Sequence, residues 1–239
     1  MKVKLIAKTD NPLSTMYTAA RTCYSEFSSI DIYSELCYNE NISNEKIINL
    51  IKKVLRSGHL SIAEHIKFTF AIEGISRSCS HQLVRHRLCT FSQQSQRYVN
   101  FKDAIFNYIT PPSIKNNETL NEEYNLIMKQ LKNFYNKAIN SNINPEDARF
   151  VLPNAASTNI VMSTNLRNLM HLCNLRLCNR AQWEIKELTQ LMVKEVLNQN
   201  KYLTECIKDF LQPSCEINGF CKEDKCCGRK PKLKDVSTF

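Results

Sequence analysis

The scarcity of glycine is the feature that most restricts the folds open to this chain. Only four glycines occur, and none of them lies between residues 75 and 218. Folds that hold nucleotides with backbone amides need clustered glycines, as in the GxGxxG fingerprint or the GxxxxGK(S/T) phosphate loop. The sequence excludes both motifs. A nucleotide site in this chain must therefore use side chains, and arginine suits it because its planar fork matches two phosphate oxygens.

The charge balance favours an anionic partner. The formal net charge is +9 over 239 residues, and the isoelectric point is near 9.0. Nucleic acid and phosphorylated small molecules both fit this balance, so composition leaves the two open. A hydrophobic content of 43% is ordinary for a chain that buries a core.

Two observations bear on the compartment. No segment approaches the ~18 consecutive apolar residues of a membrane helix. The N-terminal MKVKLIAKTDNPL alternates like a strand and lacks the apolar stretch of a signal peptide. We therefore expect a cytoplasmic protein, whose eleven cysteines would be mostly thiols because a reducing cytosol does not maintain disulfides.

Hydrophobic periodicity predicts an irregular alternation of strands and helices. Apolar residues alternate in residues 3–7 and 66–72, as in half-buried strands. Helical spacing is found in residues 14–24, 44–57, 75–84, 119–140, 165–176 and 181–198. The pattern predicts an α/β or α+β fold: a single domain with a mixed sheet flanked by helices at residues 1–212, then a Cys-rich basic tail at residues 213–239.

One short segment, residues 85–98 (RHRLCTFSQQSQRY), concentrates groups that hold anions. It contains three arginines, one histidine, two serines and three glutamines. It is either a solvated basic loop or the wall of a site for a charged ligand. No lysine occurs between Lys67 and Lys102, although lysine serves well on a solvated face, and Gln82 lies one helical turn before Arg85. These features favour a ligand site.

A second polar group lies on one face of the helix expected in NLRNLMHLCNLR. Arg167, His171 and Asn174 recur at i, i+4 and i+7, opposite an apolar stripe, and Arg176 follows near the helix end. A histidine alone is often a satisfied structural residue, but the whole stripe is harder to explain by solvation. Arg149, in DARFVLP, is another arginine beside an apolar run.

The segment GHLSIAEH has a structural interpretation. Ser61 and Glu64 have the S-x-x-E spacing of a capping box, in which serine and glutamate side chains satisfy the first N–H groups of a helix. We expect this cap to form whether or not Ser61 also touches a ligand.

Together these motifs resemble the flavin-dependent thymidylate synthase family. Arg85-His86-Arg87, seven further residues and then Ser95-Gln96-Arg97 match its RHRx7SxR signature. Further matches are GHxSxxEH at residues 58–65, FxYxxPP at 106–112, ARxVLP at 148–153, and NLRNLMHLCNLR with RAQWEI within 165–185. The resemblance spans roughly residues 1–210, nearly the whole chain.

The resemblance implies a mixed α/β fold, a homotetramer whose active sites are each built from several subunits, and conversion of dUMP to dTMP. Methylenetetrahydrofolate would supply the carbon, NADPH would reduce FAD, and the reduced flavin would supply the hydride. All of these partners are small molecules, with no nucleic acid or membrane. The positive net charge would steer such anionic ligands inward.

The resemblance also assigns residues to the ligands by their positions in the motifs. FAD contacts are implied for Ser61, Arg85, His86, Arg87, Gln93, Asn165, Arg167 and His171. Contacts to dUMP are implied for Gln82, Arg85, Gln93, Gln94, Ser95, Gln96, Arg97, Arg149 and Arg176. Arg176 is the implied catalytic residue, because a fixed guanidinium meets the charge that develops when the uracil N3 proton is lost. Some members have glutamate in place of Gln93, although glutamine also occurs in the family pattern, and other members have asparagine in place of His171, so these two contacts stay open.

Two other classes of function remain. In a nucleic-acid-binding protein we expect a run of exposed basic and aromatic residues, whereas the arginines here lie on apolar helices. A metal module is suggested only by Cys215, Cys221, Cys226 and Cys227 in the tail. Their spacing does not match the CxxC knuckle, so we expect thiols and no metal. Cys89, inside the signature, is expected to pack and not to act as a nucleophile.

Overall fold

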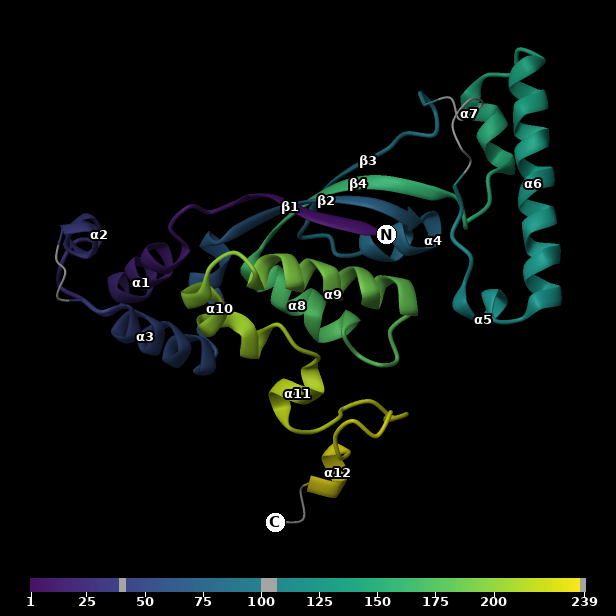
Figure 1. The fold of residues 1–239 in the computed structure, drawn as a ribbon. Helices are drawn as coiled ribbons and strands as arrows, with labels where there is room; N and C mark the ends of the chain where they lie inside the picture. Colours follow the sequence, from purple (N-terminus) through teal and green to yellow (C-terminus); the bar gives the residue numbers. More distant parts are fainter. Residues whose placement is uncertain (39–41, 100–106, 237–239) are drawn as a thin grey trace. The chain divides into compact units, whose positions relative to one another are not determined.

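The computed structural model describes residues 1–38, 42–99 and 107–236. Within these residues four strands form one sheet in the order β1-β2-β4-β3 (Figure 1). The strands are β1 (Lys2–Lys8), β2 (Lys67–Ser76), β3 (Thr90–Gln93) and β4 (Ser157–Asn165). Phe106, the first position of the FxYxxPP motif, lies outside the described residues.

Neighbouring strands run antiparallel. Thr69 on β2 is hydrogen-bonded to Ser163 on β4, and further along β2 Gly74 is hydrogen-bonded to Asn159, so residue numbers rise on one strand and fall on the other. Strand β1 is antiparallel to β2, because Thr9 pairs with Lys67 and Lys2 pairs with Glu73. Strand β3 is antiparallel to β4, because Gln94 pairs with Asn159 and Cys89 pairs with Thr164. The expectation of a mixed sheet is therefore corrected: all neighbouring strands of the described sheet are antiparallel. Strand direction depends on which strands pair, and β4 pairs with both β2 and β3 from far along the chain.

The contacts of the chain form two compact units, which we describe separately. The α6 unit consists of Met1–Lys2, Ala71–Arg87 and Phe91–Val161. The α8 unit consists of Val3–Phe70, Leu88–Thr90 and Met162–Phe239. Strands β2 and β4 contribute residues to both units. The α/β class, with one sheet and accompanying helices, agrees with the expectation from sequence.

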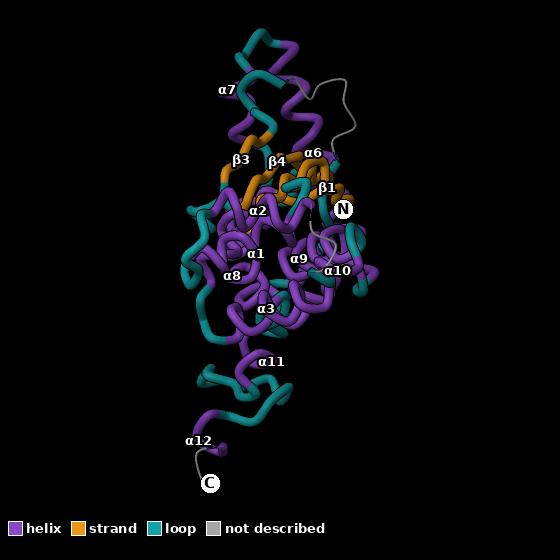
Figure 2. The backbone as a smooth tube through the Cα atoms, turned by 90° about the vertical axis from the view of Figure 1, so that its left-hand side faces the viewer, coloured by secondary structure: helices purple, strands orange, loops and turns teal. Residues whose placement is uncertain are grey.

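The α8 unit is mainly helical. Its helices are α1 (Pro12–Thr22), α2 (Ser29–Tyr38), α3 (Asn44–Arg56), η1 (Leu60–His65), α8 (Leu166–Arg176), α9 (Trp183–Leu197), α10 (Lys201–Ile207), η3 (Lys208–Phe210), α11 (Ser214–Asn218) and α12 (Leu233–Val236). Figure 2 shows α1, α3, α8, α9 and α10 gathered together, and α8 packs against both η1 and α9.

Helix α3 shows how local sequence sets these boundaries. Its first turn is capped by the Ser43 hydroxyl, which accepts the N–H of Lys46. Ile47, Ile48, Ile51 and Leu55 form the buried stripe. Gly58 follows the helix end with φ of +82°, a left-handed conformation that glycine adopts without strain. The helix predicted at residues 44–57 is confirmed.

Helices α8 and α9 form much of the core of their unit. Leu166, Leu169, Leu172 and Cys173 of α8 and Ile185, Leu188, Met192 and Val196 of α9 are all fully buried. Each such aliphatic side chain stabilises the fold by about 1.5–3 kcal/mol relative to exposure. This burial fixes the rotation of α8 about its axis, so its polar stripe is kept on the opposite side.

The α6 unit is built around one long helix. Its helices are α4 (Arg77–Leu83), α5 (Pro112–Lys115), α6 (Glu118–Asn140), α7 (Pro145–Ala148) and η2 (Arg149–Val151). Met128 of α6 and Ala156 are buried together, with Tyr108, Tyr124, Leu131 and Leu152 packed around them. The helix predicted at residues 119–140 is confirmed. Helix α7 begins at Pro145, a residue that suits the first helical position because it lacks an N–H.

Candidate functional site

The polar stripe of α8 lines a cavity of about 590 Å³ in the α8 unit. The helix is capped by Asn165, whose side chain accepts the N–H of Asn168 at 2.8 Å. Arg167, His171 and Asn174 lie along the cavity wall with Asn165 and Asn168. Because the apolar face of α8 is packed in the core, the opposite face of the helix places these polar groups side by side along the cavity. The structure thus groups the stripe as the sequence predicted.

Two features of this cavity suit a polar ligand. Arg167 forms an ion pair with Glu64 of η1, and both side chains are about half exposed. The side-chain oxygen of Asn174 is buried and has no hydrogen-bond partner among the described residues. An unpaired buried acceptor is costly, so a ligand N–H that paired with it would bind favourably. Asn174 lies on the predicted stripe, although the resemblance assigned it no ligand.

Ser61 lies elsewhere. It lines a different cavity of about 640 Å³, together with Thr15 and Thr18 of α1 and Tyr33 of α2. The structure therefore does not bring Ser61 into the cavity of the α8 stripe. The expected capping box is also wrong: η1 is a 3₁₀ helix that begins at Leu60 and has no side-chain cap, and the Glu64 carboxylate pairs with Arg167 instead.

The residues around the RHR motif follow α4 in the α6 unit. The helix is capped by Ser76, which accepts the N–H of Cys79, and it ends at Leu83. Gln82 and His86 are half-buried, whereas Arg85 and Arg87 are exposed. Because the helix ends before it reaches Arg85, this arginine lies in the turn that follows the helix.

The glutamines of the signature are held by hydroxyl and amide groups of the α6 unit. Gln93 donates to the Ser80 hydroxyl at 2.9 Å and to the Thr158 hydroxyl at 3.3 Å. Gln94 accepts from the Asn159 amide at 3.2 Å. These bonds fix the side chains at the end of β3 beside β4. Ser95 and Gln96, which follow, are half-buried.

Arg97 and Arg149 both contact Glu146 of α7. Arg97 forms an ion pair with the Glu146 carboxylate at 3.1 Å, and Arg149 donates to the Glu146 backbone carbonyl at 3.0 Å. The guanidinium of Arg77, at the start of α4, also lies near Arg149: burial, and secondarily the charge of Arg149, lower the pKa of Arg77. The structure thus gathers three arginines. Arg77 was missed from sequence because nothing in its local pattern indicated Arg149 as a neighbour.

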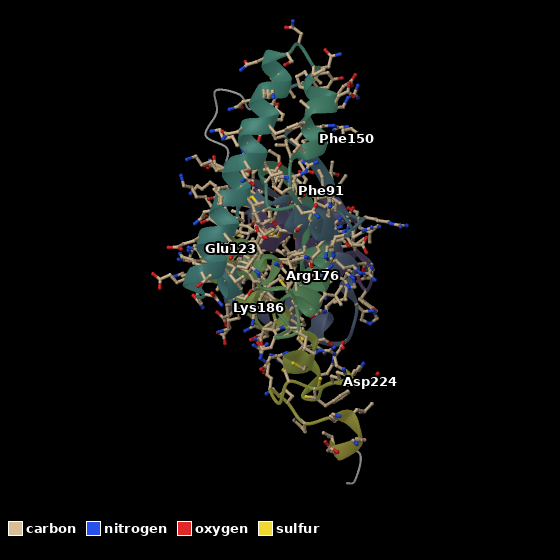
Figure 3. The ribbon with its side chains drawn as sticks, turned by 90° about the vertical axis from the view of Figure 1, so that its right-hand side faces the viewer. Phe91, Glu123, Phe150, Arg176, Lys186 and Asp224 are labelled. Carbon is tan, nitrogen blue, oxygen red and sulfur yellow. The ribbon has the colours of Figure 1, made fainter. Side chains whose placement is uncertain are left out.

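Arg176, labelled in Figure 3, is the last residue of α8. It lines a third cavity, of about 480 Å³, with residues of the C-terminal tail. Asn174 lines both this cavity and that of the α8 stripe. Arg176 therefore follows the polar stripe along the helix but lines a different cavity.

The expected site residues are thus divided between the two units. The α8 unit carries Ser61, Asn165, Arg167, His171 and Arg176, and the α6 unit carries Gln82, Arg85, His86, Arg87, Gln93, Gln94, Ser95, Gln96, Arg97 and Arg149. Each unit by itself presents a cluster of cations and amides of the kind that binds phosphate and heterocycle edges.

Two cysteines close to these clusters are poor nucleophiles. Burial raises the pKa of the Cys89 thiol, and its hydrogen bond with the Thr164 hydroxyl, 3.3 Å away, offsets this only in part. Burial raises the pKa of Cys173, on the apolar face of α8, to about 12. Since the thiolate is the nucleophilic form, both thiols are suited to packing.

Comparison with known proteins gives a consistent result. The family model described as "Thymidylate synthase complementing protein" matches residues 4–199. Proteins named flavin-dependent thymidylate synthase are 38% identical in Geobacter sulfurreducens, over 98% of this chain and 97% of that protein, and 41% identical in Nitratidesulfovibrio vulgaris, over 96% and 95%. The one from Clostridium tetani is 38% identical over 99% of this chain and 96% of its own length.

A solved structure supports the fold. The crystal structure of a UMP/dUMP methylase from Streptomyces cacaoi, bound with 5-Br dUMP, superposes with a TM-score of 0.72, covering 87% of this chain and 94% of that one. Its sequence identity of 21% supports the fold alone. The family match and the full-length relatives support more: this chain belongs to the flavin-dependent thymidylate synthase family.

Proposed function

We propose that this protein makes dTMP from dUMP by reductive methylation, with methylenetetrahydrofolate as carbon donor, NADPH as reductant and FAD as the bound redox cofactor. The family supports the reaction, and relatives that carry the name of this enzyme align over nearly the whole chain. The observation that carries most weight within the structure is the cavity along α8, where arginine, histidine and asparagine side chains share one wall.

The residues of this cavity fit a flavin nucleotide. Arg167 offers a cation for a phosphate, and its bond to Glu64 is a half-exposed ion pair that a ligand can replace at small cost. The Asn174 oxygen is an acceptor in need of an N–H, which a heterocycle edge supplies. We assign the FAD contacts to Asn165, Arg167 and His171 in this unit, and to Arg85, His86, Arg87 and Gln93 in the α6 unit. FAD, when bound, would carry the hydride from NADPH to the substrate carbon.

Ser61 stays in the proposed FAD set with less support, because it lines a separate cavity with α1 and α2. A ligand as long as a dinucleotide extends over more than one pocket, so a contact at Ser61 would involve a different part of FAD from that at Arg167.

We assign dUMP to Gln82, Arg85, Gln93, Gln94, Ser95, Gln96, Arg97, Arg149 and Arg176. Arg97 and Arg149 already meet at Glu146, and the Arg97–Glu146 pair is about half exposed. A phosphate dianion would attract both guanidinium groups more strongly than one carboxylate does, and it can accept two parallel N–H bonds from each. We infer that the nucleotide phosphate replaces Glu146 as the partner of Arg97.

Arg176 would act on the base. A guanidinium stays charged at all working pH values, so it can stabilise the uracil anion that forms when the N3 proton is lost, and this makes C5 nucleophilic. Because the group is fixed at the end of α8, it meets the developing charge without reorganisation. No thiolate is needed for this step, in keeping with the raised pKa of Cys89.

The assembly and location remain part of the proposal. We propose a homotetramer with active sites shared between subunits, as the family resemblance implies, and a cytoplasmic location, as expected from the sequence. No helix among the described residues is long and apolar enough to cross a membrane. We propose residues 1–212 as the catalytic domain and residues 213–239 as a separate Cys-rich tail.

Steady-state assay of the purified protein tests the reaction. We expect a yellow protein with FAD absorbance that forms dTMP only when dUMP, methylenetetrahydrofolate and NADPH are all present. Omission of any one of the three should abolish the product. A colourless protein that FAD cannot reconstitute, or dTMP formation that persists without flavin, would contradict the proposal.

A further inference from the structure

Five cysteines line one cavity of about 480 Å³ in the α8 unit, and none of them belongs to the residues assigned to FAD or dUMP. They are Cys178, Cys215, Cys221, Cys226 and Cys227, all free thiols. Cys178 lies in the segment between α8 and α9, whereas the other four belong to the tail. We propose that this cluster is a structural zinc site with Cys178, Cys215, Cys221 and Cys227 as ligands.

Polar contacts hold the tail against the segment that carries Cys178. The guanidinium of Arg229 donates to the Leu177 carbonyl at 3.2 Å and to the Asn179 side-chain oxygen at 2.9 Å. Arg180 pairs with Glu223 at 2.8 Å. These bonds involve residues on both sides of Cys178, so the approach of the tail thiols to Cys178 is fixed by several contacts at once.

Hydrogen-bond donors lie beside two of the sulfurs and help to hold them in place. The backbone N–H of Arg180 donates to the Cys178 sulfur at 3.5 Å. The Asn179 side-chain amide donates to the Cys227 sulfur at 3.7 Å. Hydrogen-bond donors of this kind also orient the ligands of a metal site.

Cys226 and Cys227 are adjacent, and the hydrogen bonds distinguish them. The Cys226 sulfur is already engaged by two backbone groups: it accepts the N–H of Gly228 at 3.3 Å and donates to the Lys230 carbonyl at 3.2 Å. In the hydrogen bond between the Asn179 side chain and Cys227, the Cys227 sulfur is the acceptor. Gly228 follows with φ of +83°, a left-handed turn directly after the cysteine. We therefore choose Cys227 as the fourth ligand.

The charge of the surroundings supports a tetrathiolate. Four thiolates and one Zn²⁺ carry a net charge of −2, which is costly to hold in a partly enclosed cavity without cations nearby. The same cavity is lined by Arg176, Arg180, Lys222, Arg229 and Lys230. Zinc is the metal that four cysteines in a closed, redox-inactive site prefer, and such sites stabilise small irregular segments.

The sequence argument against a metal considered the tail alone, and Cys178 supplies the ligand that the tail spacing lacks. Among the described residues, no three potential ligands are yet gathered around a point where an ion would fit. Binding therefore requires the thiols to rotate toward the cavity centre. The bound ion would then link the tail to Cys178, two residues after Arg176, and would hold the C-terminal end of α8 in place.

Elemental analysis of the full-length protein, expressed with zinc in the medium and dialysed, tests the proposal. We expect about one zinc ion per chain. Cys178→Ser and Cys227→Ser should each lower the zinc content at least about fivefold, whereas the matched control Cys226→Ser should retain it. Zinc-free wild-type protein, iron in its place, or full zinc content in Cys178→Ser would overturn the site. Loss of zinc in Cys226→Ser alone would overturn the choice of Cys227.

A measurement on the wild-type protein covers the case in which a variant fails to fold. In the zinc-loaded chain, iodoacetamide should modify the exposed Cys23 but leave Cys178 and Cys227 unmodified, as mapped by mass spectrometry. After a zinc chelator, the latter two should become reactive while Cys23 is unchanged. Equal reactivity of Cys178 and Cys227 with and without chelator would contradict the proposal. Neither experiment depends on flavin or on thymidylate synthesis.

Discussion

Replacement of Arg167 by alanine should separate ligand binding from folding. Arg167 is half exposed, and its ion pair is with the half-exposed carboxylate of Glu64. Double-mutant measurements on exposed pairs give about 0.2–1 kcal/mol, and alanine is favourable in a helix. We therefore expect the free energy of unfolding to fall by at most about 1 kcal/mol, which lowers the melting temperature by no more than about 4 °C for a chain of this size.

The effect on FAD affinity should be much larger. A hydrogen bond from a guanidinium to an anionic ligand contributes about 1.5–3 kcal/mol, because both the charge and the donor are lost on substitution. This range corresponds to a roughly 10- to 150-fold increase in the dissociation constant of FAD. Titration of the flavin-free protein, followed by quenching of flavin fluorescence, measures it directly.

Glu64→Gln is the matched control. It breaks the same ion pair but keeps the arginine, so the change in melting temperature should be similar to that of Arg167→Ala. FAD should bind Glu64→Gln as tightly as wild type, or more tightly, because Arg167 is no longer neutralised by the carboxylate. The reasoning is refuted if Arg167→Ala binds FAD within about twofold of wild type, or if Glu64→Gln weakens FAD to the same extent.

Substitutions at four further residues test the substrate side and the role of Cys89. Arg176→Ala should lower turnover at saturating dUMP by about 100-fold, or ~3 kcal/mol, with FAD content unchanged, and Arg176→Lys should restore only part of it, since an ammonium lacks the planar fork; near-normal turnover would exclude the role. Cys89→Ser should keep most activity, because a buried thiol that donates to Thr164 and whose pKa is raised stays protonated at neutral pH. Its alkylation should accordingly speed up only at strongly alkaline pH, and inactive Cys89→Ser with FAD still bound would contradict this. Arg97→Ala should weaken dUMP binding about 10-fold or more, whereas Glu146→Gln should leave it equal or tighter; parallel losses in both variants would show that the carboxylate is needed for binding.

Helix positions could be predicted from sequence where one face is strongly apolar. Helix α3 has its cap, buried stripe and terminal glycine in register, and the polar stripe of α8 follows from the burial of the opposite face. These features depend on neighbours three or four residues away, so local sequence contains the information.

Features that depend on distant residues could not be predicted in this way. Glu64 was expected to cap its own helix, but an arginine on α8 competes for the carboxylate. Arg77 of α4 lies near Arg149 of η2 in the same unit, although the two are far apart in sequence, and no local pattern shows this. Cys178 was likewise not connected with the tail, since the contacts made by Arg229 become visible only in the folded chain.

The most direct test of the central claim is a single-turnover experiment with reduced flavin. The purified protein would be reduced anaerobically with NADPH, freed of excess reductant, and mixed with dUMP and methylenetetrahydrofolate. We predict that the oxidised flavin absorbance returns and that about one dTMP forms for each flavin reoxidised. If dTMP formed while the flavin stayed reduced, or if the flavin were reoxidised with no dTMP, the flavin would not be the hydride donor and the account would be wrong.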